Sequence, residues 1–229
     1  MRQIQSQPSL AMRVKEAILD EITSGRLGPK SRVIQDQIAK NLGVSRQPVQ
    51  QALHILRSQG VVRDAPGRGL EVVPLDLTYV QNVYDLRAVI EGLASRQAAL
   101  SRPEQAVERG KELIDKGKDA VRRSAFREMV ACDMEFHNWI YALSDNPLIS
   151  ATMETHWTTI QRVMGEVLHS DDKPRNIWDQ HEKIVEAIAK GDADKAEEVT
   201  KEHILLSAGY MIEHLGLTQQ GTDTDAEAS

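Results

Sequence analysis

The sequence predicts a mainly α-helical protein in two domains, and three observations support this prediction. Apolar residues recur at steps of three and four along most of the chain, the period of one helix face. β-branched runs with turn residues between them are concentrated in residues 61–73. The net charge changes from +5 over residues 1–75 to −11 over residues 76–229, so a basic domain precedes an acidic one.

The basic region is predicted to contain three helices and a hairpin. Residues 10–24 form a first helix, and residues 34–42 form a second helix. Ser45 is a suitable N-cap for a third helix, which Gly60 ends. Short β-branched runs around a Pro-Gly-Arg-Gly turn then form a two-stranded hairpin in residues 61–73. Three helices followed by such a wing make a winged helix-turn-helix domain over residues 1–75.

The acidic region is predicted to be an antiparallel all-helical bundle over residues 76–216. Short connections that contain Pro, Gly or Asp-Asn separate the helical segments. We expect six helices, at residues 78–100, 103–118, 122–143, 147–168, 175–190 and 192–216. Residues 217–229 are polar and acidic, and we expect them to be a disordered tail.

Composition limits the class of protein and its compartment. No apolar run has the length that a membrane-spanning helix needs, and the first residues lack the apolar core of a signal peptide. The single cysteine, Cys132, has no partner for an internal disulfide, which suits a reducing compartment. We therefore expect a cytoplasmic protein with no membrane partner.

Four polar residues occupy positions on otherwise apolar helix stripes of the bundle: Asp133, His137, His181 and His203. Polar groups that face a core are costly unless something pairs with them. A single buried histidine is readily satisfied by a backbone carbonyl, but four such positions together favour one shared divalent ion. Aspartate oxygen and histidine nitrogen suit zinc, our first candidate, and also nickel or manganese.

Two arginines of the bundle are candidates for an anion site. Arg87 lies on the apolar stripe of its helix, and a buried guanidinium requires a partner. That partner is either an internal carboxylate, from Asp133 or Glu91, or a small carboxylic acid bound by the planar fork. Arg162 is predicted to project into the same bundle. An ion with one anionic protein ligand would add positive charge beside them, so we expect an acidic effector.

The third helix of the basic domain is the candidate DNA-reading element. Ser45, Arg46, Gln47 and Gln50 lie on its exposed first turn, where Arg pairs with guanine and Gln with adenine in the major groove. Arg68 at the tip of the hairpin would contact the backbone or the minor groove. One such helix reads only a few base pairs, so we expect a homodimer that binds an inverted repeat in double-stranded DNA.

The segment LGVSRQPVQQALHILRSQGVV, with the hairpin glycine Gly67, resembles the GntR family of bacterial transcription regulators. The resemblance runs from about Val14 to Val73 and implies a winged DNA-binding domain, with Gly67 at the wing tip. Two positions depart from the family pattern. Gln50 stands where members usually have arginine, and Asp36 stands where a basic residue is common. The operator sequence usual in the family is therefore not assumed.

The bundle resembles the FCD effector domain of the FadR branch of that family. The resemblance covers about residues 78–215 and rests on several short motifs, which are Arg87 with Glu91, Asp133-x-x-x-His137, His181-Glu182, Ala187-Ile188-x-x-Gly191-Asp192 and His203. It implies that one aspartate and three histidines hold a divalent metal beside a small organic acid. The expected six helices indicate the shorter, VanR-like variant. A ligand-responsive repressor is the function that this resemblance implies.

A metal-dependent hydrolase is the alternative function, because one aspartate and three histidines can also activate water. Several motifs typical of such enzymes do not occur. His181-Glu182 lacks the second histidine of the zincin helix motif, and we find no His-Asp dipeptide, glycine-rich phosphate loop or nucleophile elbow. These features favour the regulator and predict no enzymatic activity.

Overall fold

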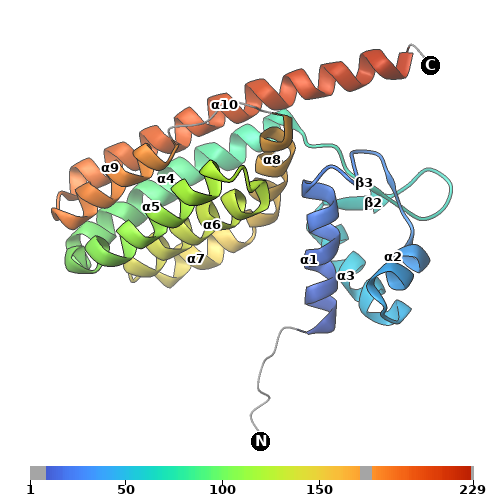
Figure 1. The fold of residues 1–229 in the computed structure, drawn as a ribbon, viewed down its shortest axis with the longest axis horizontal. Coiled ribbons are helices and arrows are strands. Elements are labelled where there is room, and N and C mark those ends of the chain that lie inside the picture. Colours follow the sequence, from blue (N-terminus) through green and yellow to red (C-terminus); the bar gives the residue numbers. More distant parts are fainter. Residues whose placement is uncertain (1–8, 171–176, 228–229) are drawn as a thin grey trace, which may run out of the picture. The chain divides into compact units, whose positions relative to one another are not determined.

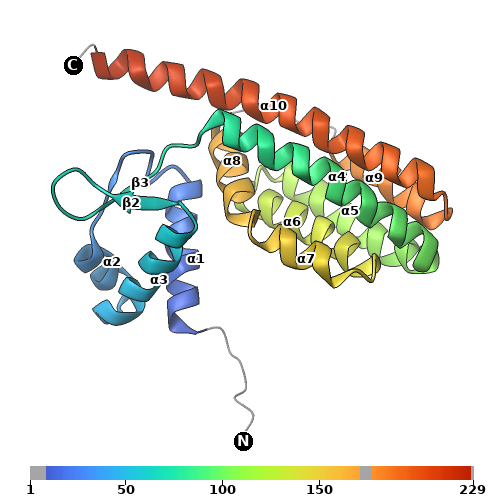
Figure 2. The ribbon, with the colours of Figure 1, turned by 180° about the vertical axis from the view of Figure 1, so that it is seen from behind.

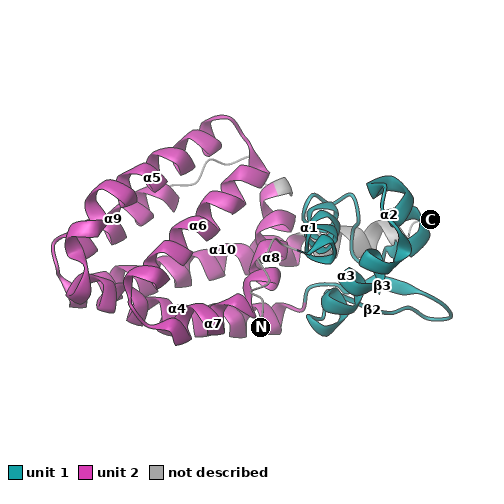
Figure 3. Cartoon of the chain, turned by 90° about the horizontal axis from the view of Figure 1, so that it is seen from below, with its two compact units in different colours: residues 1–75 teal, residues 76–229 magenta. Residues whose placement is uncertain are grey.

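The computed structural model describes residues 9–170 and 177–227 and divides the chain into two compact units, residues 1–75 and 76–229 (Figure 3). The described residues contain ten α-helices and three strands, so the predicted mainly α-helical class is confirmed. No helix among these residues is long and apolar enough to cross a membrane.

The first unit contains three helices and a small antiparallel sheet in the order β1-β3-β2. The elements are α1 (Leu10–Thr23), β1 (Arg32–Val33), α2 (Gln35–Leu42), α3 (Arg46–Ser58), β2 (Val62–Asp64) and β3 (Leu70–Val72). The expected wing had two strands, and the structure adds β1, in which Arg32 lies opposite Glu71. The sequence did not predict β1, because a two-residue strand among turn residues is too short to show the alternation of apolar and polar residues that indicates a strand.

Helix α3 is fixed by its ends and by its buried stripe. Gly43 ends α2 with a φ of 63°, a left-handed conformation that glycine adopts without strain. Ser45 is the N-cap of α3 as predicted, although within the described residues its side chain makes no capping hydrogen bond. Val49, Leu53 and Leu56 are buried against α1 and the sheet, which leaves the opposite face of α3 exposed.

The second unit is an all-helical bundle (Figures 1 and 2). Its elements are α4 (Leu77–Ser101), a 3-10 turn (Pro103–Gln105), α5 (Ala106–Arg122), α6 (Phe126–Leu143), α7 (Pro147–Glu154), α8 (Trp157–Ser170), α9 (Ile177–Ala189) and α10 (Ala193–Glu227). The described residues thus form seven α-helices, and the six-helix prediction is wrong. The segment expected as one helix over residues 147–168 breaks at Thr155 and His156. Neither proline nor glycine marks that break.

The chain end differs from the prediction as well. Helix α10 continues to Glu227, whereas residues 217–229 were expected to be disordered. Extending an existing helix is much easier than nucleating one, and no proline interrupts these residues. Residues 171–176, which include the start of the predicted fifth helix, and residues 228–229 lie outside the described residues.

Two close helix contacts shape the bundle. Helices α4 and α10 lie side by side (Figures 1 and 2), and the buried Thr200 hydroxyl donates to Ser95 Oγ at 2.8 Å. Helix α5 approaches α9 through a glycine seam, which we define as Gly110 and Gly117. A Cβ atom at Gly117 would lie 2.0 Å from the Trp178 ring, so only glycine fits there without a shift of that ring or of α9.

Candidate functional site

The three predicted histidine ligands meet inside the second unit. His137 of α6, His181 of α9 and His203 of α10 are each at most 2% exposed, and one nitrogen of each lies within 4.8 Å of the others. The Nε2 atoms of His181 and His203 are 3.1 Å apart. Asp133, one turn before His137, places its carboxylate oxygens 3.5 Å from His181 Nε2 and 3.8 Å from His137 Nε2.

These separations fit a metal centre. Ligand atoms at about 2.0–2.1 Å from a tetrahedral zinc ion lie roughly 3.3 Å from one another. The 3.1 Å between the Nε2 atoms of His181 and His203 and the 3.5 Å between Asp133 and His181 are close to that separation, and the 3.8 Å between Asp133 and His137 is somewhat longer. In a metal-free core, aromatic nitrogens that face one another at 3.1 Å require one of them to donate a proton. A divalent ion would satisfy all of these groups.

Two further residues, which the sequence did not assign to the site, fix the histidine rings from behind. Nδ1 of His137 lies 2.6 Å from Glu91 Oε2, and Nδ1 of His203 lies 2.8 Å from Gln180 Oε1. Gln180 forms a hydrogen bond with His203 Nδ1, and a partner of this kind holds the proton on Nδ1 and leaves the Nε2 lone pair for a metal. The face of α4 pointed to Glu91 only as a partner of Arg87, and no pattern in the sequence singled out Gln180.

Burial keeps two of these imidazoles neutral. Desolvation lowers the pKa of His181 well below its usual value, and the neighbouring His203 and His137 lower it further. The pKa of His203 is also well below its usual value, first because of desolvation and then because of His137. Neutral imidazole is the form that binds metal. The ring of Phe136 stacks on His181 at 4.0 Å between centroids and holds it in place.

Arg87 forms a buried ion pair on the same side of the bundle. Its Nε donates to Glu91 Oε1 at 2.6 Å, and both side chains are at most 3% exposed. Burial lowers the pKa of Arg87, but the charges of Glu91, Tyr84 and Tyr141, together with the hydrogen bond to Glu91, outweigh that effect and raise it overall. For Glu91, burial raises the pKa, and Arg87 with His137 more than reverses this. Both groups are charged, and Glu91 connects Arg87 to the histidine cluster.

Arg162 is buried as predicted, at 6% exposure on α8. Desolvation lowers its pKa, and the charge of Glu166 offsets part of that effect. Beside Asp133 the structure has a cavity of about 20 Å³, lined also by Met164 and Trp178. That volume accommodates about one water molecule. An organic acid at this position therefore requires side chains to move.

In the first unit, the predicted DNA-reading residues share the exposed face of α3. Ser45, Arg46, Gln47 and Gln50 are all exposed. Arg46 is also ion-paired, because its guanidinium contacts the Asp36 carboxylate of α2 through two nitrogens, at 2.7 and 2.9 Å. The sequence indicated Asp36 only as a departure from the family pattern, and it did not predict this pair.

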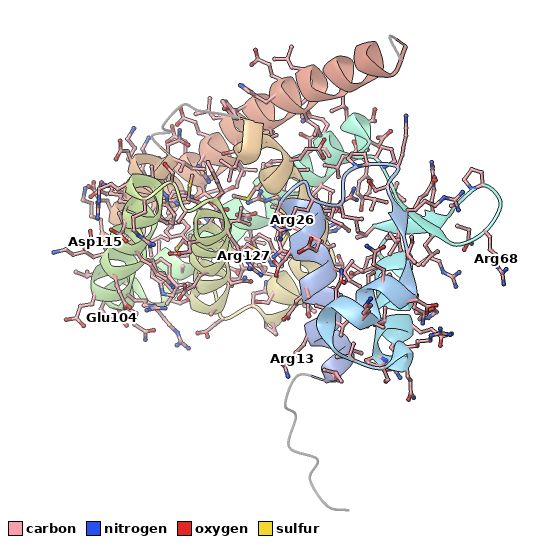
Figure 4. All side chains as sticks on the ribbon, turned by 45° about the vertical axis from the view of Figure 1, so that its right-hand side comes forward. Arg13, Arg26, Arg68, Glu104, Asp115 and Arg127 are labelled. Carbon is pink, nitrogen blue, oxygen red and sulfur yellow. The ribbon has the colours of Figure 1, made fainter. Side chains whose placement is uncertain are left out.

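The wing tip has the backbone that its glycines allow. Gly67 and Gly69 have φ values of 91° and 96°, which favour glycine. Arg32 of β1 braces this loop by donating to the backbone oxygens of Pro66, at 2.8 Å, and of Arg68. Arg68 itself is exposed and projects from the loop (Figure 4). The bracing role of Arg32 was not predicted, since it depends on a strand that the sequence did not indicate.

Two family models match the chain. The model described as "Bacterial regulatory proteins, gntR family" matches residues 10–72, and the FCD domain model matches residues 82–206. These ranges lie within the two units that the structure separates. The FCD match alone covers more than half of the chain.

Relatives and solved structures agree with these matches. The chain is 24% identical over 202 residues to the HTH-type transcriptional regulator YdfH of Escherichia coli O6:H1, covering 88% of this chain and 89% of the relative. It is 25% identical over 178 residues to the HTH-type transcriptional repressor RspR of Escherichia coli K12, covering 78% of each chain.

The fold is similar to that of E. coli McbR/YncC, with a TM-score of 0.79 at 20% identity, covering 90% of this chain and 99% of the other. A putative GntR regulator from Rhodococcus sp. RHA1 gives a TM-score of 0.74 at 22% identity, covering 90% and 98%. The families and relatives are transcription regulators and not enzymes, so the hydrolase alternative has no support. The chain is a transcription regulator of the GntR family that carries a DNA-binding helix-turn-helix domain and an FCD domain.

Proposed function

We propose that this regulator is a repressor whose bundle binds one divalent metal ion and a small carboxylic acid, and that the acid changes its affinity for operator DNA. The observation that carries the proposal is the cluster of three buried histidines, in which one ring nitrogen of each lies within 4.8 Å of the others and the Asp133 carboxylate lies 3.5 Å from His181 Nε2, while Glu91 and Gln180 lie against two of the Nδ1 atoms. That arrangement suits a metal, because the outer partners hold the rings so that their free nitrogens face one point.

His137, His181, His203 and Asp133 would hold the ion, which is zinc, nickel or manganese by the chemistry of its donors. The bound ion supplies positive charge that attracts a carboxylate. With one anionic ligand among four, the centre keeps a net positive charge in a medium of low dielectric constant. Arg162 is a further buried cation of the same bundle, whereas the charge of Arg87 is balanced by Glu91.

The acid is expected to be small, such as a hydroxy acid, dicarboxylate or sugar acid. The cavity of about 20 Å³ at Asp133 must enlarge to admit even these. The buried pair of Arg87 and Glu91 offers a route for coupling, because Glu91 contacts both the guanidinium and His137. An acid that binds the Arg87 guanidinium in place of Glu91 would change the contact between Glu91 and His137, which is a proposed metal ligand.

Small acids should raise the melting temperature of metal-loaded protein, and Arg87→Lys should weaken this response. The substitution keeps the positive charge beside Glu91 but removes the planar fork that binds a carboxylate bidentately. Affinity should fall by about tenfold or more, since hydrogen bonds to charged groups contribute about 1.5–3 kcal/mol. A thermal-shift series over acids and matched amides measures it. Stabilisation by the amides alone would contradict the proposed acid site.

Ser45, Arg46, Gln47 and Gln50 are proposed to read an operator in the major groove, with the wing residues Gly67 and Arg68 at the DNA backbone or minor groove. Their support is a shared exposed face on α3 and an exposed wing tip. The acid is proposed to release the operator, as expected of a repressor that responds to an inducer; one relative is described as a transcriptional repressor.

Arg46→Ala should weaken operator binding by roughly 1–3 kcal/mol if Arg46 reads a base. Gel-shift titration against a duplex selected from random DNA by the wild-type protein measures the loss. Arg26→Ala is the matched control, because Arg26 is another ion-paired, exposed arginine of the same unit and lies outside α3. Equal affinity of Arg46→Ala and wild type would remove Arg46 from the reading surface.

A homodimer is proposed to form through α4. Leu86, Val89, Leu93 and Leu100 recur at steps of three, four and seven on that helix and are 38–66% exposed. An apolar stripe of this length on the surface of a helical bundle is typical of a protein interface. A second copy of the chain is its natural occupant, because an inverted repeat requires two reading helices related by twofold symmetry.

Leu93→Glu should convert the dimer to a monomer and lower operator affinity by about tenfold or more, since a buried charge strongly opposes association. Sedimentation equilibrium and gel shift measure the two effects. Leu148→Glu is the control, because Leu148 is 73% exposed on a different helix, α7, and does not belong to the stripe. A dimer that survives Leu93→Glu would exclude the α4 stripe as its interface.

A further inference from the structure

The bidentate pair between Asp36 and Arg46 joins the helix that precedes the turn to the first residue of the reading helix. Arg46 Nε lies 2.7 Å from Asp36 Oδ1, and Arg46 Nη2 donates to Asp36 Oδ2 at 2.9 Å. The adjacent Gln35 donates from Nε2 to the backbone oxygen of Arg46 at 3.0 Å. Consecutive residues of α2 therefore hold both the backbone and the side chain of Arg46.

The position of the Asp36 carboxylate on the Arg46 guanidinium determines which N–H donors of Arg46 remain free. Asp36 occupies the side of the fork formed by Nε and Nη2. Of the five N–H donors of Arg46, three remain, two on Nη1 and one on Nη2. One N–H of Nη1 and the remaining N–H of Nη2 point along the end of the fork, and they form the parallel pair that matches O6 and N7 of guanine. The pair with Asp36 thus leaves the base-reading edge open.

The charges around Arg46 also favour contact with a base over contact with a phosphate. Arg46 is the first residue of α3, where the helix dipole is positive and opposes a cation. The Asp36 carboxylate offsets that repulsion, and it also repels DNA phosphates. An arginine neutralised in this way loses attraction for the backbone and keeps its directional donors for a base edge.

The pair contributes little to folding. Both side chains are largely exposed, 73% for Arg46 and 62% for Asp36, and exposed ion pairs add little to stability. A role in folding therefore does not explain it, and substitutions at Asp36 should leave the domain intact.

We propose that Asp36 is a positioning residue that presents Arg46 to guanine and makes Arg46 a base contact rather than a phosphate contact. This inference rests on the proposed function, since it requires Arg46 to lie at the DNA. It goes beyond that function by assigning a base to Arg46 and the choice of that base to a residue on another helix.

The test is selection from random-sequence duplex DNA with the full-length chain, followed by sequencing. Wild type, Asp36→Asn, Arg46→Ala and Glu21→Gln are compared. Glu21→Gln is the matched control, because it breaks another exposed bidentate arginine pair of the same unit, with Arg26. Affinity for one selected duplex and for a scrambled duplex of equal length is then measured over a range of salt concentrations.

Wild type should select guanine at one position of each half-site, and Arg46→Ala should lose that preference. With Asp36→Asn, the preference for guanine over adenine there should fall by about tenfold, since a bidentate contact discriminates by about that factor or more. Affinity for the scrambled duplex should rise, and the salt slope should steepen by about one unit, as expected for one more phosphate contact. Glu21→Gln should match wild type.

Undiminished guanine preference in Asp36→Asn would overturn the inference while leaving Arg46 as a DNA contact. If Asp36→Asn binds both duplexes more tightly by the same factor and keeps the preference for guanine, then Asp36 acts only by repelling the DNA phosphates. Wild-type selection by Arg46→Ala would instead remove Arg46 from the reading surface, and with it this inference. Arg46→Ala thus tests whether Arg46 contacts the DNA, and Asp36→Asn tests separately whether Asp36 positions it.

Discussion

Chelation of the proposed metal ion should lower the melting temperature of this protein by roughly 8–16 °C. An ion present at about a thousand times its dissociation constant adds about 4 kcal/mol to the folded state. For a chain of this size each kcal/mol corresponds to about 2–4 °C. The effect is large because the ion would bind four polar groups in a core, including the Nε2 atoms of His181 and His203 at 3.1 Å.

Elemental analysis and calorimetry together measure this. Protein purified with metal and without chelator should carry about one ion per chain, and His137→Ala or His203→Ala should lose it. His54→Ala is the control, because His54 lies exposed on α3 in the other unit. Metal content is the deciding measurement, since an alanine in the core also destabilises by packing. Absence of metal in the wild type, or identical unfolding with and without chelator, would refute the proposed centre.

Arg87→Met should destabilise the metal-free protein by about 3–5 kcal/mol, because it leaves the Glu91 carboxylate charged and buried without its guanidinium. This corresponds to a loss of roughly 6–20 °C in melting temperature. If Arg87 served only to bind the acid, its removal would not destabilise the protein to this extent. The ion pair therefore makes Arg87→Lys the better probe of acid binding.

The double variant Arg87→Met/Glu91→Gln should recover most of that loss. It removes the stranded charge and keeps an amide oxygen to accept from His137 Nδ1. Urea unfolding of the two variants in chelator measures the difference, and chelator excludes any contribution from metal binding. If the double variant is no more stable than the single one, the cost lies in lost packing of the Arg87 side chain and not in the charge of Glu91.

Much of this fold follows from periodicity and punctuation in the sequence. Gly43 and Ser45 define the turn before α3, and Pro147 marks the start of α7. The division between α7 and α8 was missed because Thr155 and His156 are compatible with a continuing helix. The strand β1 was missed because two residues carry no period. Both features are determined by tertiary contacts.

The site shows the same limit. Polar residues at Asp133, His137, His181 and His203 were detectable because each interrupts an apolar stripe. Gln180 was not, since it lies beside His181 at a position where a polar residue is unremarkable, and its contact with His203 joins α9 to α10. The pair of Asp36 and Arg46 likewise joins α2 to α3. Contacts between elements require the fold before they can be found.

The glycine seam on α5 has a consequence for the metal centre. Gly117 lets α9 approach so closely that Trp178 packs against the α5 backbone, and the Trp178 ring lies 4.7 Å from the His181 ring. The position of a nitrogen that we propose as a metal ligand therefore depends on the absence of a methyl group on another helix. If the proposed centre binds a metal, apolar substitutions at Gly117 or Trp178 should change its affinity, so this chain could retain every proposed ligand and still lose its sensitivity to the ion.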